Sequence, residues 1–337
     1  MHIKKVITIL FWLLICCPLF AATSDIEPGL QQFLAPYGDK VGVYFIDTKS
    51  SFEVGVNAEK QFPTASVGKV PVMVTAFHLA ETGKLMLEAR LPLKESDKLP
   101  GSGVLQWMRP GRTSYSIRNL IRMMIVLSDN TATKMVIGQV GLEEINHYMQ
   151  SLGLNGISIV DTTMLNEPPA EAINLSTPQD MARLLLRIKN DPMLSPAFKA
   201  EMLSYMRNQR YRWGIWKGVP PGVIVADKTG NVDKVLNDVG LVYSPAGNYV
   251  LSVFTCGFEK QRDAKKIINK ISEIVYNAYV PACYAKEIKP AKKVKIKKKK
   301  RTYSRKKTKR RSLNRKDRVL NNPTRGFYFH HIPDSAV

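Results

Sequence analysis

The chain has 337 residues and a formal net charge of +22, but most of this positive charge is concentrated near the C-terminus. Residues 289–318 carry eighteen lysines and arginines against one aspartate, which accounts for 17 of the 22 net positive charges. The remaining chain is close to neutral, which excludes a folded domain whose own surface is strongly basic.

The first residues have the layout of a secretory signal peptide. Lys4 and Lys5 precede an apolar run over residues 6–20, and Ala21-Ala22 follow as small residues suited to cleavage. A membrane anchor is the weaker alternative, because this run is shorter than the ~20 residues that a spanning helix needs. We therefore predict a signal peptide over residues 1–21 and a periplasmic or secreted protein.

Two cysteines remain after removal of that segment. Cys256 lies in a strand-like run and Cys283 follows the last helix-like run. Outside the cytoplasm the two can form a disulfide, or they can be separate buried thiols. The sequence leaves both alternatives open, because it gives no distance between them.

Residues 22–285 are long enough for a large core, and the strand-like runs lie at the two ends of this region. They predict a five-stranded, mostly antiparallel sheet built from residues 38–60 and 220–257. The five runs are Val41–Asp47, Phe52–Val56, Val223–Lys228, Asp238–Tyr243 and Tyr249–Thr255. Residues 263–279 have apolar side chains at helical spacing and should pack on this sheet as a terminal helix.

Residues 65–210 have the apolar spacing of helices, as in Met181, Leu184, Leu185 and Ile188. We predict an all-α lobe inserted between the strands of the sheet, with a long loop over residues 165–178. The fold class is therefore α/β in the α+β sense: a five-stranded sheet, flanking terminal helices and an inserted helical lobe.

The segment Ser66-Val67-Gly68-Lys69 pairs a hydroxyl with an ammonium one helical turn away. Ser66 precedes an apolar helical stretch, so it should lie at a helix N-terminus, where free backbone N–H groups can stabilise an oxyanion. This arrangement suits a serine nucleophile with Lys69 as its base. The alternative is that Ser66 only caps the helix and that Lys69 is solvated.

Two further motifs follow in order, Ser128-Asp129-Asn130 and Lys228-Thr229-Gly230. The first supplies a hydroxyl and an amide, and the second supplies a cation beside a hydroxyl on a strand. Taken singly, they read as a helix cap and a strand end. A chance S-x-x-K also occurs at Ser304, but all three motifs in order make coincidence a poor explanation.

Their chemistry predicts one serine-acylation site. Lys69 can act as a base only if burial or a second cation lowers its pKa, and Lys228 is the candidate cation. Ser128 would relay a proton to the leaving nitrogen, and Asn130 would hold the substrate amide. Lys228 and Thr229 would attract a substrate carboxylate.

The strand edge beside the nucleophile completes this prediction. Gly230 should leave the edge open, and the backbone N–H of Asn231 should be the second donor to the oxyanion. The Asn231 side chain is not required for this role.

These residues resemble the class A β-lactamases and, more broadly, the penicillin-recognising active-serine enzymes. The resemblance covers roughly residues 25–284. It rests on Leu127–Ala132, Val225–Gly230, Ser176-Thr177-Pro178 and Met181-Ala182. It implies a β-lactamase-like fold, no cofactor, the roles given above for the motif residues, and a β-lactam or a peptidoglycan peptide as substrate.

One departure from the family pattern concerns release of the acylated serine. The class A family carries Glu-x-x-Leu-Asn, whose glutamate activates the hydrolytic water. Here Leu165 and the substrate-site residue Asn166 are present, but Thr162 stands at the glutamate position. The nearby acids are Asp161, Glu167 and Glu171, and none has the right spacing. Acylation is better supported than deacylation, so slow release as in penicillin-binding proteins is an alternative to turnover.

Other site types find little support. His78 and His147 lack a ligand pattern for zinc, so we predict no metal. The family places an aromatic residue at the cleft mouth in the stretch that contains Trp107, and packing in the core or at the surface is an equal alternative.

The C-terminal residues 286–337 cannot bury their charge and are predicted to be a disordered polycation. Anionic envelope surfaces are the expected partners, and a solvated tail with no partner is the alternative. Nucleic acid is disfavoured, because Tyr303 is the one aromatic residue in the basic run. We expect a monomeric hydrolase, and the alternative is a binding protein that has kept the fold without turnover.

Overall fold

The computed structural model describes residues 25–50, 52–164 and 173–281. One five-stranded sheet has the order β2-β1-β9-β8-β7, and every neighbouring pair is antiparallel. The strands are β1 (Val41–Asp47), β2 (Glu53–Val56), β7 (Ile224–Val232), β8 (Val235–Ser244) and β9 (Gly247–Cys256). The predicted fold class is confirmed for the described residues.

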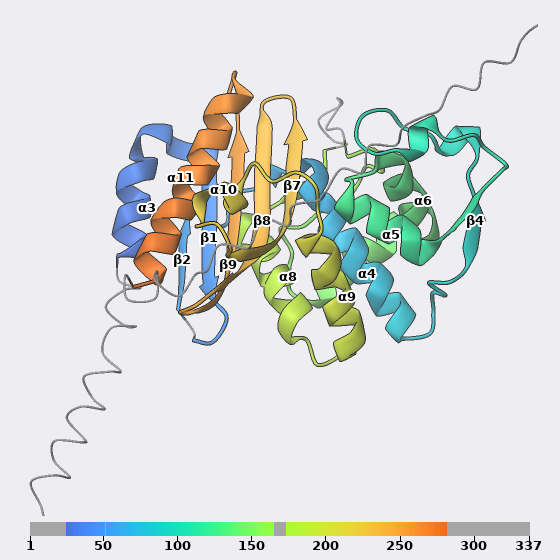
Figure 1. Ribbon diagram of the computed structural model, residues 1–337, viewed down its shortest axis with the longest axis horizontal. Helices are drawn as coiled ribbons and strands as arrows, with labels where there is room; N and C mark the ends of the chain where they lie inside the picture. The colour runs from blue at the N-terminus through green and yellow to red at the C-terminus, as the bar shows by residue number, and fades with distance from the viewer. Residues whose placement is uncertain (1–24, 51, 165–172, 282–337) are drawn as a thin grey trace, which may run out of the picture. The chain divides into compact units, whose positions relative to one another are not determined.

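Helices cover both faces of the sheet. Figure 1 shows α3 (Ile26–Leu34) and α11 (Gln261–Tyr279) side by side on one face, and α8 (Pro178–Asn190) lies toward the helical lobe. Strand β1 is buried along its whole length, because Val43 and Phe45 pack in one core and Tyr44 and Ile46 in the other. This division follows from the alternation of side chains along a strand.

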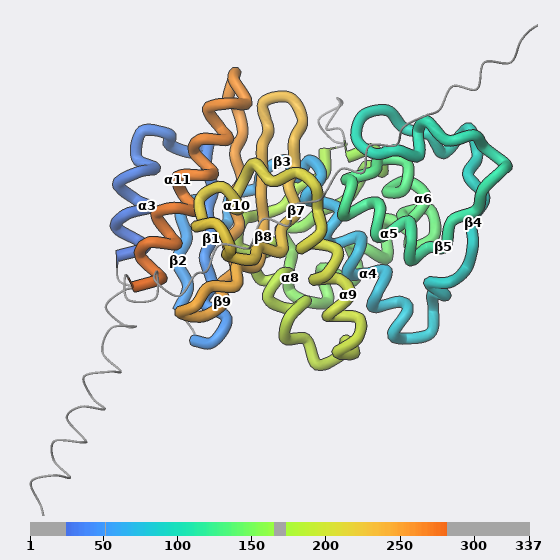
Figure 2. Tube along the Cα trace, viewed as in Figure 1, coloured from blue at the N-terminus to red at the C-terminus, as the bar shows by residue number. Residues whose placement is uncertain are grey.

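The chain leaves the sheet after β2, builds the helical lobe and returns at β7, as the colours of Figure 2 show. The lobe contains α4 (Lys69–Glu81), α5 (Ile117–Val126), α6 (Asn130–Val140), α7 (Leu142–Ser151) and α9 (Pro196–Arg207). Shorter elements are η1 (Ala35–Lys40), η2 (Ala65–Gly68), η3 (Glu95–Asp97), η4 (Leu105–Trp107), α10 (Ile215–Gly218), β3 (Phe62–Pro63), β4 (Arg90–Pro92), β5 (Ser114–Ser116) and β6 (Leu175–Ser176). Helix α4 is apolar on nearly every side, which is typical of a central helix.

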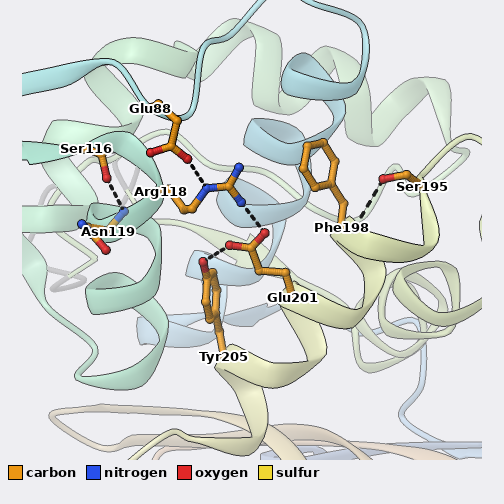
Figure 3. A network of polar contacts seen from close by, with 8 residues as sticks. All are labelled: Glu88, Ser116, Arg118, Asn119, Ser195, Phe198, Glu201 and Tyr205. Atoms are coloured by element: carbon orange, nitrogen blue, oxygen red, sulfur yellow. Dashed lines mark hydrogen bonds and ion pairs between the residues drawn. The ribbon is translucent and has the colours of Figure 1, made fainter.

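A polar network joins α5 to α9 within the lobe (Figure 3). Arg118 pairs with Glu88, 2.6 Å away, and with Glu201, which also accepts a hydrogen bond from Tyr205. The arginine side chain is 30% exposed, so this network lies partly out of water. It fixes the packing of the helix that leads into the Ser128 turn.

Two predicted segments differ in detail from the structure. Strand β7 continues beyond Lys228 to Val232, because β8 pairs with it up to the turn at Asp233 and Lys234. The long predicted loop ends in a short strand, β6, which pairs with β3 next to the serine. None of the described helices combines the length and apolar character needed to cross a membrane.

Several predictions lie outside the described residues. These are the signal peptide, the basic tail, Asn166 and the pairing of Cys256 with Cys283. Cys256 itself is partly buried at the end of β9.

Candidate active site

The segment that carries Ser66 is clamped from two sides. Ser66 is the second residue of η2, directly before α4. From β8, the amide of Asn237 donates to the carbonyl of Pro63 at 2.8 Å and to that of Thr64 at 2.9 Å. The Thr64 N–H donates to the carbonyl of Asn174 at 2.8 Å. The sheet and the loop before β6 therefore fix where the serine lies.

Lys69 is fully buried at the start of α4. Its Nζ lies 2.7 Å from the Ser128 carbonyl, 2.7 Å from Asn130 Oδ1 and 3.2 Å from Ser128 Oγ. Burial, and then the charge of Lys228, hold the pKa of Lys69 well below its usual value, while Asp129 opposes the shift. A neutral amine can donate its two hydrogens to the two carbonyl oxygens and keep its lone pair free to accept a proton.

Ser128 Oγ lies between two lysines, because Lys228 Nζ is 3.0 Å away from it. Lys228 is also fully buried and donates to the Thr229 carbonyl at 2.7 Å. Burial lowers the pKa of Lys228 to about 7. The three groups form a continuous proton path from Lys69 through the Ser128 hydroxyl to Lys228.

Backbone strain accompanies this arrangement. Ser128 has φ of +54° and Ala65, next to the nucleophile, has φ of +45°. Non-glycine residues in this region cost about 1–3 kcal/mol each and occur where the surrounding structure holds them in place. Ala65 begins η2, directly before the nucleophile, and Ser128 lies in the turn between α5 and α6.

The structure thus brings Lys69, Ser128, Asn130 and Lys228 into direct contact. Ser66 Oγ, with its residue 9% exposed, has no hydrogen-bond partner among residues 25–50, 52–164 and 173–281. Hydrogen bonds to a nucleophile are often long in a free enzyme and tighten when substrate binds. The Ser66 to Lys69 proton transfer therefore remains a prediction.

Strand β7 is an edge strand, and Gly230 faces η2 across a narrow gap. A Cβ at Gly230 would lie 2.8 Å from the Thr64 carbonyl oxygen and 3.2 Å from the Val67 nitrogen. Asn231 follows on the same edge, and its side chain donates to Gln261 Oε1 at 3.3 Å. The Asn231 side chain is thus engaged at the surface, and the oxyanion role of its backbone N–H stays a prediction.

Replacing Gly230 by alanine should slow acylation about 100-fold, because η2 must move away from β7 and misplacement of a reacting group has effects of this size. The rate of adduct formation with a penicillin measures this effect. Gly138→Ala is the matched control, since a Cβ there meets no atom within 4 Å. If both variants lost the acylation rate equally, the contact between β7 and η2 would not be the cause.

The loop before β6 does not supply a substitute carboxylate from Asp161. That carboxylate accepts from the backbone N–H groups of Thr163 and Met164, at 3.0 and 3.1 Å, and from the Thr163 hydroxyl. Thr162 instead lines a groove of about 680 Å³ on the helical lobe, together with Gly138. Within the described part of the chain, no carboxylate bonds to Lys69, and Glu167 and Glu171 lie outside it.

Met164, in the described part of this loop, packs close to Gly68, directly before α4. Its side chain is 1% exposed, and its sulfur would lie 3.1 Å from a Cβ placed on Gly68. Asn174, buried at 1%, closes the loop by accepting from the N–H groups of Val160 and Asp161. Asn174 is therefore a structural residue of this loop.

Three supporting side chains were given no role in the sequence-based prediction. Asn237 holds the serine segment, and Gln209 donates to Asp227 Oδ2 at 2.6 Å, directly behind Lys228. Asp129 accepts from the N–H groups of Val104 and Leu105 at 2.6 and 3.0 Å. Asp129 also caps α6, which is the part of its role that its place before a helix could have predicted.

Two fully buried carboxyl groups, Asp227 and Asp238, lie behind Lys228. Burial raises the pKa of both, and the charge of Asp227 raises that of Asp238 further. Asp238 Oδ2 accepts from the Ile215 N–H at 2.7 Å, whereas its Oδ1 has no partner among the described groups. A proton retained by this pair avoids two adjacent buried charges.

Asp238→Asn should weaken the dependence of stability on pH. A carboxyl group with a raised pKa binds a proton in the folded but not in the unfolded chain above pH ~4, so stability falls as pH rises through this window. The free energy of unfolding should therefore decrease between pH 5 and pH 8 by about 1–3 kcal/mol less in Asp238→Asn than in the wild type. Urea unfolding at each pH measures this difference. Asp233→Asn, at an exposed position, is the control. If the free energy of unfolding changed with pH equally in Asp238→Asn and in the wild type, the assignment of a retained proton to Asp227 and Asp238 would be wrong.

The described residues contain no group of three or more histidine, cysteine, aspartate and glutamate side chains placed to hold a metal ion. His78 stacks on Tyr148 with ring centroids 3.9 Å apart, and His147 is exposed. Trp107 is 80% exposed, so it is not a core residue.

Comparison with known proteins agrees with this geometry. A model of the beta-lactamase enzyme family matches residues 25–279. Beta-lactamase CTX-M-8 from Citrobacter amalonaticus is 24% identical over 270 residues, covering 78% of this chain and 92% of the relative.

Solved structures show the same fold. A beta-lactamase from Sphaerobacter thermophilus is 28% identical, with a TM-score of 0.71 over 77% of this chain and 98% of that one. A mutant of PBP-A, solved as an acyl-enzyme complex with penicillin G, is 30% identical, with a TM-score of 0.69 over 76% of this chain and 96% of that one. The chain belongs to the beta-lactamase enzyme family and is of the class A type.

Proposed function

We propose that this protein is an exported active-serine enzyme that β-lactams acylate at Ser66 and that releases the acyl group slowly. The observation that carries the proposal is the buried chain of contacts in which Ser128 Oγ lies 3.2 Å from Lys69 Nζ and 3.0 Å from Lys228 Nζ. This chain can take a proton from the nucleophile and deliver one to the leaving nitrogen.

The acylation step follows from the arrangement. Ser66 Oγ attacks the β-lactam carbonyl, its proton passes to Lys69, and the carbonyl oxygen becomes an anion stabilised by the backbone N–H groups of Ser66 and Asn231. Collapse of this intermediate breaks the C–N bond, and the nitrogen takes a proton from Ser128. The positive charge of Lys228, together with the Thr229 hydroxyl, attracts the carboxylate of the substrate.

Slow release is supported by the groups around Lys69. Its polar partners are two carbonyl oxygens and one hydroxyl, and the Asp161 carboxylate is bound within its own loop. A general base contributes about 10²–10⁴-fold to the rate of a hydrolytic step. Without such a base, hydrolysis of the ester is expected to be slower than its formation. The acyl-enzyme complex of a PBP-A mutant with penicillin G is a precedent for the acylation step in a structure of the same fold.

The test is intact mass spectrometry of the mature full-length protein with penicillin G over time. We expect a stoichiometric adduct that persists after free penicillin has been removed. A transient adduct with accumulating hydrolysed product would contradict slow release and favour turnover by a base from the loop. No adduct at all would contradict acylation and favour a binding protein.

The proposal that the enzyme is exported rests on the predicted signal peptide, and the basic tail would then hold it near anionic envelope surfaces. Raising the salt concentration should release the protein from such surfaces, because the attraction between exposed charges is screened.

A further inference from the structure

The loop of residues 99–112, here called the Trp107 loop, presents apolar side chains to solvent at its tip. Trp107 is 80% exposed, Met108 43% and Val104 40%, whereas Leu105 between them is fully buried. Single exposed apolar residues are common, but three within five positions, including a tryptophan, form a patch that indicates an interaction surface.

The same loop is positively charged. No aspartate or glutamate occurs between residues 98 and 128. Arg109 and Arg112 follow the apolar tip, are exposed, and form no ion pair with any residue that the structure describes. The combination of a tryptophan, neighbouring apolar residues and unpaired arginines is typical of segments that lie at the surface of an anionic bilayer.

Several backbone groups of the Trp107 loop are paired by internal bonds. The N–H groups of Trp107 and Met108 donate to the carbonyls of Val104 and Leu105 at 3.1 and 3.0 Å. The side chain of Gln106 donates to the Gly101 carbonyl at 2.6 Å. These bonds reduce the number of backbone groups that would lack a partner when the tip enters the lipid interface. The loop is thus a preformed structure that needs little rearrangement to dock.

We propose that the Trp107 loop docks on an anionic lipid bilayer, with Trp107 and Met108 entering the boundary between headgroups and acyl chains. Arg109 and Arg112 would contact the anionic headgroups. The loop is bonded to the active site, because Asp129 accepts from Val104 and Leu105, and the Asn130 N–H donates to the Ser102 carbonyl at 3.1 Å. Docking would therefore place the mouth of the Ser66 site at the membrane surface.

The experiment must separate the Trp107 loop from the basic tail, which should also attract anionic lipid. The mature full-length protein is mixed with vesicles of phosphatidylglycerol and phosphatidylcholine in equal amounts, with or without brominated acyl chains. Insertion of Trp107 shifts tryptophan emission to the blue, and the brominated chains quench it. Binding through the tail alone does neither, because Trp213 and Trp216 pack against the α3–α11 core.

We expect Trp107→Ala to lose the quenching and to weaken vesicle binding about tenfold, the effect of exposing one large apolar side chain. Trp107→Phe should lose the quenching but keep most of the binding. Arg109→Gln with Arg112→Gln should also weaken binding about tenfold at low salt. Met193→Ser, which removes a 67% exposed apolar side chain between α8 and α9, should change nothing.

Two results would overturn the proposal. One is vesicle binding by the wild type without quenching, and the other is quenching that persists in Trp107→Ala. If Trp107→Ala slowed acylation by soluble penicillin and left vesicle binding unchanged, the Trp107 loop would instead belong to the rim of the substrate site. The docking proposal does not rest on acylation, since the mass of the Ser66 adduct is measured separately.

Discussion

Ser66→Ala should abolish the covalent adduct with penicillin. Ser66 is the proposed nucleophile, because Lys69 of the Lys69, Ser128 and Lys228 cluster begins the helix directly after its segment and Gly230 of β7 packs against that segment. Removing the hydroxyl leaves no atom there that can form the ester. Intact mass after long incubation should show only the unmodified protein.

The chain offers a matched control in Ser304→Ala, which alters the chance S-x-x-K of the basic tail. This variant should form the adduct at the wild-type rate. Thermal unfolding of Ser66→Ala should remain close to that of the wild type, since Ser66 Oγ bonds to no other described group. An adduct that survives in Ser66→Ala would show that another residue is the nucleophile.

Strand boundaries show how far local patterns can predict this fold. Strand β1 spans Val41–Asp47, as predicted, because its apolar side chains fill both cores. The predicted end of β7, Lys228, was wrong by four residues. Gly230 and Asn231 have low strand propensity, so the strand pattern in the sequence stops before them. Their strand conformation comes from pairing with β8, which is a tertiary contact.

The candidate site was predictable as a set of residues but not as a network. The motifs predicted that Lys69, Ser128 and Lys228 meet, and the structure brings them together. The motifs did not predict that the Asn237 side chain would hold the serine segment by donating to the Pro63 carbonyl, 174 positions earlier in the chain. Such long-range side-chain bonds leave no local periodicity in a sequence, and neither does the buried pair of Asp227 and Asp238.

The loop that follows α7 illustrates a different limit. Spacing alone placed Thr162 at the position of the family glutamate, with Asp161 as a neighbouring acid. The structure uses Asp161 to close a turn and brings Met164, with φ of +58°, against the start of α4. A turn that depends on one side chain can change which residue of a loop faces the site, so alignment by spacing does not determine orientation.

Lys69→Met should slow acylation by about 10²–10⁴-fold, the usual contribution of a general base. Methionine has a similar length and suits a buried position, so the variant should fold. The rate of adduct formation under conditions of excess penicillin measures the loss. Lys84→Met, which alters an exposed lysine just beyond the end of α4, is the control and should retain the wild-type rate.

The pH dependence of acylation tests the same assignment independently. In the proposed mechanism the active form of Lys69 is the neutral amine, so the rate of acylation should rise with pH until Lys69 has lost its proton. Burial, and then the charge of Lys228, lower the pKa of Lys69, which places this rise well below the usual lysine range. In the same mechanism Lys228 must keep its charge to attract the carboxylate, and burial lowers its pKa to about 7. The rate should therefore fall again as pH rises through about 7, which gives a bell-shaped profile.

Lys228→Met separates the two limbs of this profile. Burial of Lys69 is unchanged in this variant, but the positive charge that adds to its effect is gone, so the pKa of Lys69 rises and the acid limb moves to higher pH. It also removes the group that titrates near pH 7, so the alkaline limb should disappear while the affinity for the substrate carboxylate falls. A profile in which neither limb moves would show that the two buried lysines are not the titrating groups, and a wild-type rate in Lys69→Met would place the base elsewhere.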